Sequence, residues 1–176
     1  MIRVGLLDED VPLELVGGEL VFTEPQGSRH YTAVTLVSDA LRAALGSGWF
    51  VRAHGPVVLD HESEPEPDVS VVRGTPRDYS DAHPARPVLT VEVSASGSRL
   101  TFDRAHKGSL YARADLPDFW IVNLVDEVVE IYRDPIADDA SAFGWRFGSR
   151  EVQRRGEYVS PLAEPSARIE VSSLLP

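Results

Sequence analysis

Hydrophobic and polar positions in the first half of the chain follow two different periods. Residues 13–22, LELVGGELVF, form two alternating runs around Gly17 and Gly18, which predicts a hairpin with a two-residue turn. From Ser28 to Leu45 the apolar positions recur at helical spacing, and Ser28 is suited to cap this helix. Strands are predicted over residues 49–53, 56–59 and 69–72.

The second half predicts strands on both sides of one more helix. Residues 88–94, VLTVEVS, are rich in β-branched side chains and form the clearest strand. Residues 101–114 have a helical pattern, which Gly108 weakens. Further strands are predicted over residues 119–122, 128–132 and 168–171. Because the helices are few and not strictly interleaved with the strands, we predict an α+β (mixed α/β) fold, in which two main helices flank a mixed sheet with extra antiparallel strands.

The composition is that of one globular domain spanning residues 1–176. Hydrophobic residues make up 43% of the chain and charged residues 26%, which are ordinary values for a folded domain. No stretch approaches the roughly 18 uncharged apolar residues of a membrane helix, so we expect no membrane association. The chain has no cysteine, which excludes disulfides, cysteine–zinc sites and thiol catalysis and fits a cytoplasmic location.

The net charge of −11 narrows the possible partners. General binders of nucleic acid are usually basic, because phosphate contacts release counterions. This chain is therefore not a general polyanion coat, although a local basic patch beside an acidic metal site remains compatible with its charge. The surplus of carboxylates also suits a hard cation. Phosphate-loop, dinucleotide-binding and zinc-protease motifs do not occur, and the five histidines are scattered.

Two carboxylates differ from the other acidic residues because they adjoin or interrupt apolar strands. The acidic residues from Asp60 to Glu64 fit a solvated loop, whereas Asp68 lies where the chain enters an apolar strand. Glu92 interrupts the valine-rich strand, where a buried charge is tolerated only beside a cation, a metal or a hydrogen-bond network. Strand alternation alone leaves open whether Glu92 faces the core or the solvent.

The second predicted helix carries a further group of charged residues. Asp103 and Lys107 are four residues apart and share a face, which is compatible with a site beside the Glu92 strand or with an exposed ion pair. Arg99, Arg104 and Arg113 add positive charge nearby. This region is the best candidate for a basic patch that binds phosphate.

Six segments of the chain, taken in order, carry a family resemblance. They are ELVGGEL (14–20), EPQGSRHYTAVTLVSDAL (24–41), PEPDVSVV (65–72), LTVEVSASGS (89–98), FDRAHKGSLYARADLPDFWIVNL (102–124) and VVEIYR (128–133). Together they resemble the Uma-type restriction endonuclease family, a branch of the PD-(D/E)xK nuclease superfamily. Each segment alone is a weak signal, whereas six with compatible spacing indicate kinship.

The resemblance implies a restriction-endonuclease-like core and a metal site. The core consists of a helix, three strands, a second helix and a fourth strand. Asp68 and Glu92 would bind Mg²⁺ or Mn²⁺ together with the backbone carbonyl of Val93. Position 94, where the superfamily pattern has its lysine, is Ser94. In the Uma-type family the lysine lies on the following helix, which corresponds here to Lys107.

Three further residues are weaker candidates for the same site. Glu19 and His30 fall in stretches that resemble recurrent Gly-Glu and His positions of the family, where they would flank the metal. Capping, surface or core roles fit them equally well. Asp103 would hold Lys107 in place, or would be an ordinary acid favoured by the dipole of the first helical turn.

The functional hypothesis is a metal-dependent endonuclease that hydrolyses phosphodiester bonds, with DNA as the expected substrate and a homodimer as the expected assembly. Mg²⁺ needs few carboxylates besides water and phosphate oxygens, and it lowers the pKa of its bound water. Lys107 would orient that water or offset developing negative charge. Two alternatives stay open: a noncatalytic protein-interaction module that keeps the nuclease fold, and a metal-dependent hydrolase of a small phosphoester.

Overall fold

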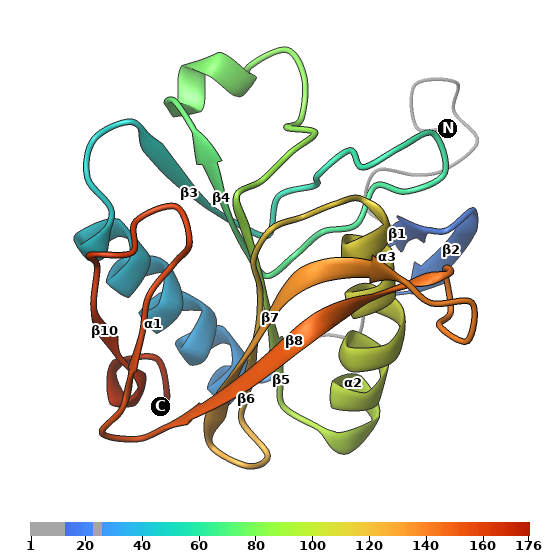
Figure 1. The fold of residues 1–176 in the computed structure, drawn as a ribbon. Coiled ribbons are helices and arrows are strands. Elements are labelled where there is room, and N and C mark those ends of the chain that lie inside the picture. The colour runs from blue at the N-terminus through green and yellow to red at the C-terminus, as the bar shows by residue number, and fades with distance from the viewer. Residues whose placement is uncertain (1–12, 23–25) are drawn as a thin grey trace.

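The computed structural model describes residues 13–22 and 26–176 as an α+β fold around a six-stranded mixed sheet (Figure 1). The strands are β1 (Leu13–Val16), β2 (Glu19–Phe22), β3 (Trp49–Ala53), β4 (Val69–Arg73), β5 (Leu89–Ser94), β6 (Phe119–Asn123), β7 (Val128–Ala137), β8 (Trp145–Arg154), β9 (Tyr158–Val159) and β10 (Ile169–Glu170). The helical segments are α1 (Ser28–Ala44), η2 (Pro76–Tyr79), α2 (Gly97–Phe102), η3 (Asp103–Lys107), α3 (Gly108–Arg113) and η4 (Val171–Ser173).

The main sheet has the strand order β3-β4-β5-β6-β7-β8. Only the neighbours β5 and β6 of this sheet run parallel, and the chain between them forms α2, η3 and α3. The four other strand pairs of the sheet are antiparallel. Every residue of β5 and β6 is buried. Both faces of these central strands are therefore covered, which is why their sequences are nearly continuous in apolar residues.

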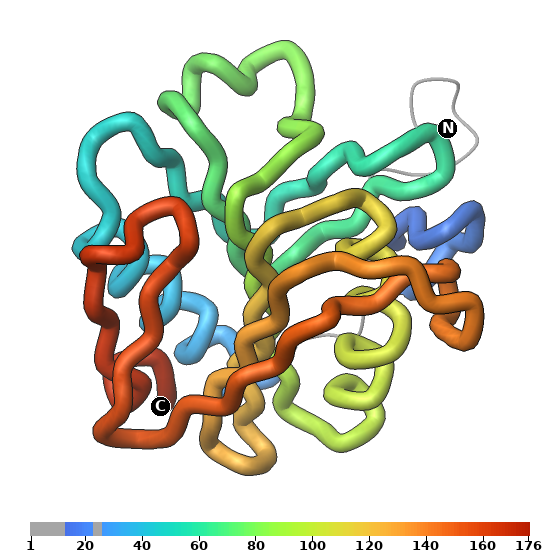
Figure 2. Tube along the Cα trace, in the orientation of Figure 1, coloured from blue at the N-terminus to red at the C-terminus, as the bar shows by residue number. Residues whose placement is uncertain are grey.

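Helices cover the two faces of the sheet separately (Figure 1). On one face, Val34, Val37 and Leu41 of α1 pack against Val91 and Val93 of β5. The C-terminal segment with β9, β10 and η4 lies beside α1 and completes this core (Figure 2). On the other face, a second apolar cluster joins residues of α2 and α3 to β6 and β8. The mixed sheet between two main helices confirms the fold predicted from the sequence.

The second helix departs from the single stretch predicted over residues 101–114. It begins at Gly97, because the side chain of Ser96 caps it by accepting the backbone N–H of Arg99. It then widens into the π-helical segment η3 before α3 continues. Asp103 and Lys107, at the two ends of η3, are both buried. Wide turns of this kind occur frequently at functional sites.

Two other local predictions were wrong. No strand forms over residues 56–59, where the backbone bonds across to irregular segments instead: Val57 donates to the carbonyl of Pro65 and Val58 to that of Pro84. The prolines in these segments have no N–H to complete a ladder. The N-cap of α1 is Gly27 rather than Ser28, which is the first helical residue.

The β1–β2 hairpin is held by the chain segment that precedes β4. Gly17 N donates to Ser63 Oγ at 3.2 Å. The backbone N–H of Gly18 donates to the carbonyl of Glu62, and that of Glu64 donates to the carbonyl of Leu15, each at 2.8 Å. These non-local bonds fix the position of the hairpin, and so of its buried residues Glu14 and Val16, relative to the segment before β4.

Replacing Gly17 by alanine is expected to destabilise the protein by about 1–3 kcal/mol. Gly17 has φ +58°, and a Cβ atom there would lie 2.2 Å from Cε1 of the Phe143 ring. Both the left-handed backbone and the displaced ring oppose the substitution. Urea unfolding measures the loss, and the matched change Gly18→Ala, at φ +86° with open space around its Cβ position, should cost less. Equal costs would show that the contact with Phe143 is unimportant.

Candidate active site

Asp68 and Glu92 come from neighbouring strands at the centre of the sheet. The antiparallel register of β4 and β5 pairs Val69 with Val91, and its continuation by one residue sets Asp68 opposite Glu92. Asp68 Oδ2 accepts the backbone N–H of Val93 at 2.7 Å. Since the N–H and C=O of one strand residue point to the same side, the Val93 carbonyl also faces the side of Asp68.

Asp68 lies between two histidines at the start of β4. Its Oδ2 atom is 3.2 Å from Nε2 of His30 on α1, and its Oδ1 atom is 3.8 Å from Nδ1 of His54. Burial acts to raise the pKa of Asp68, but the hydrogen bonds from His30 and Val93 outweigh it and the pKa is lowered. Burial acts to lower the pKa of His30, but Asp68 raises it overall. Asp68 is therefore held as a carboxylate.

Glu92 is fully buried at 0% exposure, which settles the orientation that strand alternation left open. Its Oε1 atom accepts the Tyr111 hydroxyl at 2.7 Å and lies 3.3 Å from Lys107 Nζ. Its Oε2 atom is 3.7 Å from the Arg99 guanidinium and has no hydrogen-bond partner among residues 13–22 and 26–176. Burial raises the pKa of Glu92 to about 8, although Lys107 partly opposes the shift. Lys107 and Arg99 therefore offset only part of the cost of burying this carboxylate.

Asp103 takes a different partner from the one predicted. It accepts the Ser94 hydroxyl at 2.7 Å and lies 3.2 Å from Nε of Arg99, one helical turn earlier. Burial raises its pKa to about 6, against the opposing effect of Arg99. Asp103 is thus placed to orient Arg99 by direct contact, whereas it interacts with Lys107 through the electrostatic effect of its charge.

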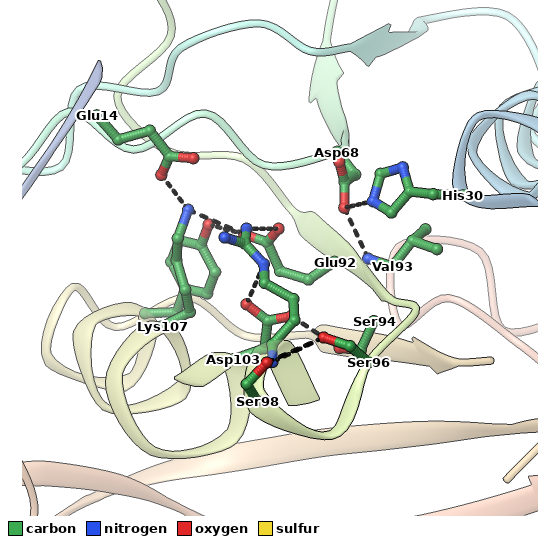
Figure 3. Close-up of polar contacts among 12 residues, drawn as sticks. Glu14, His30, Asp68, Glu92, Val93, Ser94, Ser96, Ser98, Asp103 and Lys107 are labelled. Carbon is green, nitrogen blue, oxygen red and sulfur yellow. Dashed lines mark hydrogen bonds and ion pairs between the residues drawn. The ribbon is translucent and has the colours of Figure 1, made fainter. Parts of the chain in front are cut away.

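Lys107 lies among the buried carboxylates of the site and is 1% exposed. Its Nζ atom donates to Glu14 of β1 as well as lying beside Glu92 (Figure 3). Burial acts to lower the pKa of Lys107, but Glu92 and Glu14 outweigh it and raise the pKa. The ammonium is therefore held in its charged form. Lys107 is also the single lysine of the chain, whereas every other Lys or Arg position is arginine.

Sequence reasoning missed Glu14 and named Glu19 of the same hairpin instead. Glu14 is 3% exposed and contacts Lys107, whereas Glu19 is exposed on β2. A signal was present, because strand alternation places Glu14 on the same face as the apolar Val16. A carboxylate on an apolar face needs a buried partner.

The three candidate phosphate-binding arginines have separate carboxylate partners. Arg104 bonds to Glu130 of β7, and Arg113 bonds to Asp60 at 2.7 Å. Arg99 bonds to Glu92 and Asp103 and also lines a cavity. Of the three, Arg99 is thus the one that joins the site.

The cavity beside Asp68 has a volume of about 420 Å³. His30 and His54 line it next to Asp68, and Arg99 lies between the cavity and the buried Glu92. Its remaining lining includes Glu14, Glu66, Gln26, Phe22, Ser98 and Phe102. A ligand that entered here would meet three carboxylates, two imidazoles and a guanidinium.

The donor set fits a hard divalent cation. The buried carboxylates Glu14, Asp68, Glu92 and Asp103 outnumber the cationic groups of Lys107 and Arg99, even with His30 protonated. Within the described part of the chain, the Oε2 atom of Glu92 has no hydrogen-bond donor, so it could accept a cation as a further partner. Within residues 13–22 and 26–176, no three His, Asp or Glu side chains are grouped for metal binding. A site here therefore relies on two carboxylates with backbone and water oxygens, a set that suits Mg²⁺.

The fold and the sequence together define a nuclease-like protein. A solved structure from Anabaena variabilis ATCC 29413, described as a "putative nuclease belonging to DUF820", shares the fold with a TM-score of 0.69. The two are 14% identical, and the match covers 98% of this chain and 94% of that chain. The family model described as "Uma2: Putative restriction endonuclease" matches residues 4–170, and the chain belongs to this family. No curated protein matches the chain.

Among the described residues, no helix has both the length and the apolar character needed to cross a membrane.

Proposed function

We propose that this protein is a metal-dependent endonuclease that hydrolyses phosphodiester bonds in DNA. The observation that carries the proposal is the grouping of Asp68, Glu92 and Lys107, which come from the residue before β4, from β5 and from the second helix. Membership of the restriction endonuclease family supports the reaction class. The buried position of all three side chains supports a chemical role over a solvation role.

Asp68, Glu92 and the Val93 carbonyl would hold Mg²⁺ or Mn²⁺. When bound, such an ion polarises the phosphate and lowers the pKa of a coordinated water. The hydrogen bond from the Val93 N–H keeps Asp68 ionised and oriented. His30 packs against the same carboxylate from α1 and limits its rotation.

Lys107 and Arg99 would stabilise negative charge that develops on the phosphate. The raised pKa of Lys107 makes it a donor of hydrogen bonds rather than a general base. Arg99 lines the cavity while Asp103 fixes its guanidinium, so it is placed to bind a phosphate that enters. With one such arginine at the cavity, we infer that contact with nucleic acid is local, which agrees with the net charge of −11.

The direct test is cleavage of supercoiled plasmid by the purified protein with Mg²⁺, with Mn²⁺ and with EDTA. We expect nicked and linear DNA with either metal and intact plasmid with EDTA. Parallel reactions with single-stranded DNA, RNA and bis(p-nitrophenyl) phosphate separate the DNA endonuclease from a hydrolase of small phosphoesters. Hydrolysis of the small diester alone would replace the DNA assignment.

A metal titration without substrate separates the enzyme from a noncatalytic interaction module. Mn²⁺ should raise the melting temperature, because an ion that binds only the folded state stabilises it by mass action. A melting temperature independent of Mn²⁺, together with intact plasmid, would favour the module. The homodimer stays a prediction, which the molar mass in solution tests.

A further inference from the structure

We propose that Glu14 is a positioning residue that shares the Lys107 ammonium with Glu92, so that Lys107 does not fully neutralise the Glu92 carboxylate and Glu92 can also bind a metal ion. This inference rests on the proposed function. It adds a residue of β1 to the site, which the proposed function builds from Asp68, Glu92 and Lys107.

The geometry places one ammonium between two carboxylates. Lys107 Nζ donates to Glu14 Oε2 and lies 3.3 Å from Glu92 Oε1. All three side chains are at most 3% exposed, so water does not compete for the ammonium. The contact with Glu14 is the closer of the two. The ammonium of Lys107 is thus divided between the hairpin and the strand that carries Glu92.

This competition for the ammonium has a chemical consequence. A buried lysine with one carboxylate partner forms a close ion pair, and a carboxylate neutralised in that way is a poor metal ligand. With Glu14 present, Glu92 Oε1 shares its lysine and Glu92 Oε2 keeps no hydrogen-bond partner. Glu14 therefore allows the Lys107 ammonium and the Glu92 carboxylate to be neighbours in the site without forming an exclusive ion pair.

The surrounding structure holds Glu14 firmly enough for this role. The bonds from Gly17 to Ser63 and from Glu64 to Leu15 anchor the hairpin one and three residues after Glu14. The segment that supplies these partners leads directly into Asp68. The hairpin is therefore tied to the segment that precedes Asp68, which holds Glu14 beside the site.

The choice of lysine over arginine agrees with the inference. The chain uses arginine at every other Lys or Arg position and has its single lysine here, fully buried. A guanidinium is suited to planar two-pronged bonds with a carboxylate, whereas the ammonium of lysine is a compact point charge that can lie between two carboxylates in a small space. Sharing between Glu14 and Glu92 is the arrangement that the structure contains.

The test compares Glu14→Gln with Glu62→Gln in the full-length protein loaded with Mg²⁺. Glu62 is an exposed carboxylate whose backbone also contacts the hairpin, so its replacement removes the same charge outside the site. Glu14→Gln should lower kcat for plasmid nicking by about 10- to 100-fold with little change in KM, as expected for loss of a group that orients another. Glu62→Gln should leave both parameters unchanged.

A double-mutant cycle with Lys107→Met identifies the residue through which Glu14 acts. If Glu14 works through Lys107, Glu14→Gln should cause no further loss of kcat in the Lys107→Met background. An equal loss in both backgrounds would overturn the inference and make Glu14 a direct contact of metal or substrate. Unchanged kcat in Glu14→Gln alone would overturn it as well.

A labelling experiment gives a readout that needs neither activity nor a Lys107 variant. An amine-reactive reagent can modify only Lys107 and the terminal amine, because the chain has one lysine. Peptide mass spectrometry should find Lys107 protected in the wild type and labelled faster in Glu14→Gln than in Glu62→Gln. Equal protection in all three proteins would overturn the positioning role. A wild type that cleaves no phosphodiester would instead remove the proposed function, and the inference with it.

Discussion

Replacing Glu92 by glutamine is expected to abolish metal-dependent cleavage while making the metal-free protein more stable. The loss of cleavage should reach at least about 10²–10³-fold, because a ligand of the ion that stabilises the transition state is removed. The gain in stability follows from the buried carboxylate, whose pKa is raised to about 8 by desolvation. An isosteric amide keeps the acceptor for Tyr111 and removes the buried charge.

The gain in stability from Glu92→Gln should increase as the pH rises. Because the pKa of Glu92 is higher in the folded protein than the ordinary value of 4.5, the folded state binds more protons between those two values. Stability of the metal-free wild type should therefore fall as pH rises from about 4.5 toward 8. Glu92→Gln should remove this part of the pH dependence and be more stable at pH 9 by on the order of 2 kcal/mol.

Urea unfolding in EDTA at several pH values measures this effect, and Glu130→Gln is the matched control. Glu130 is also 0% exposed in a central strand, but it has ample positive charge. Burial acts to raise its pKa, yet hydrogen bonds from Arg104 and Tyr132 lower the pKa to about 2. Glu130→Gln should therefore lose stability and retain cleavage. A Glu92→Gln protein that is less stable at pH 9 than the wild type would contradict the expectation.

Replacing Lys107 by methionine should lower both activity and stability. The substitution leaves Glu14 and Glu92 buried without the ammonium they share, and removing one partner of a buried ion pair typically costs about 3–5 kcal/mol. Cleavage should fall by about 10²-fold or more because a donor to developing negative charge is lost. The stability loss is measured by urea unfolding at pH 7 in EDTA.

Two further variants make the Lys107 prediction specific. Adding Glu92→Gln to Lys107→Met should restore part of the lost stability, because one of the two uncompensated carboxylates is then neutral. Arg113→Met removes a cation whose ion pair with Asp60 is partly exposed, so it should cost no more than about 1 kcal/mol. Equal losses for Lys107→Met and Arg113→Met would show that the buried network contributes little.

Fold class and main elements followed from local patterns of the chain. Alternation around Gly17 and Gly18 predicted the β1–β2 hairpin, and the valine-rich run around Glu92 predicted β5. The prediction failed at residues 56–59, where proline-broken segments supply irregular backbone partners, and at η3, whose wide turn has no simple periodicity. In each failure, contacts or hydrogen bonds beyond the local pattern set the backbone.

The candidate site also has features that the sequence predicted and features that it did not. Asp68, Glu92 and Lys107 were identified from the sequence, because two are charges beside or within apolar strands and all three match segments of the family resemblance. The direction of Glu92 was not predictable, since alternation cannot show whether one face or both faces of a strand are covered. Burial by α3 on one face and α1 on the other settled it.

Sequence patterns along the chain were thus enough to predict most of the strands, the two main helices and three charged residues suited to metal chemistry. The joining of Glu14 to Lys107, across 93 positions of sequence, depended on the folded arrangement. So did the pairing of Asp103 with Arg99 and the dispersal of Arg104 and Arg113 to other carboxylates. The physical reason is that the interaction between two charges depends on their distance in space, whereas sequence patterns constrain only residues that are near one another along the chain.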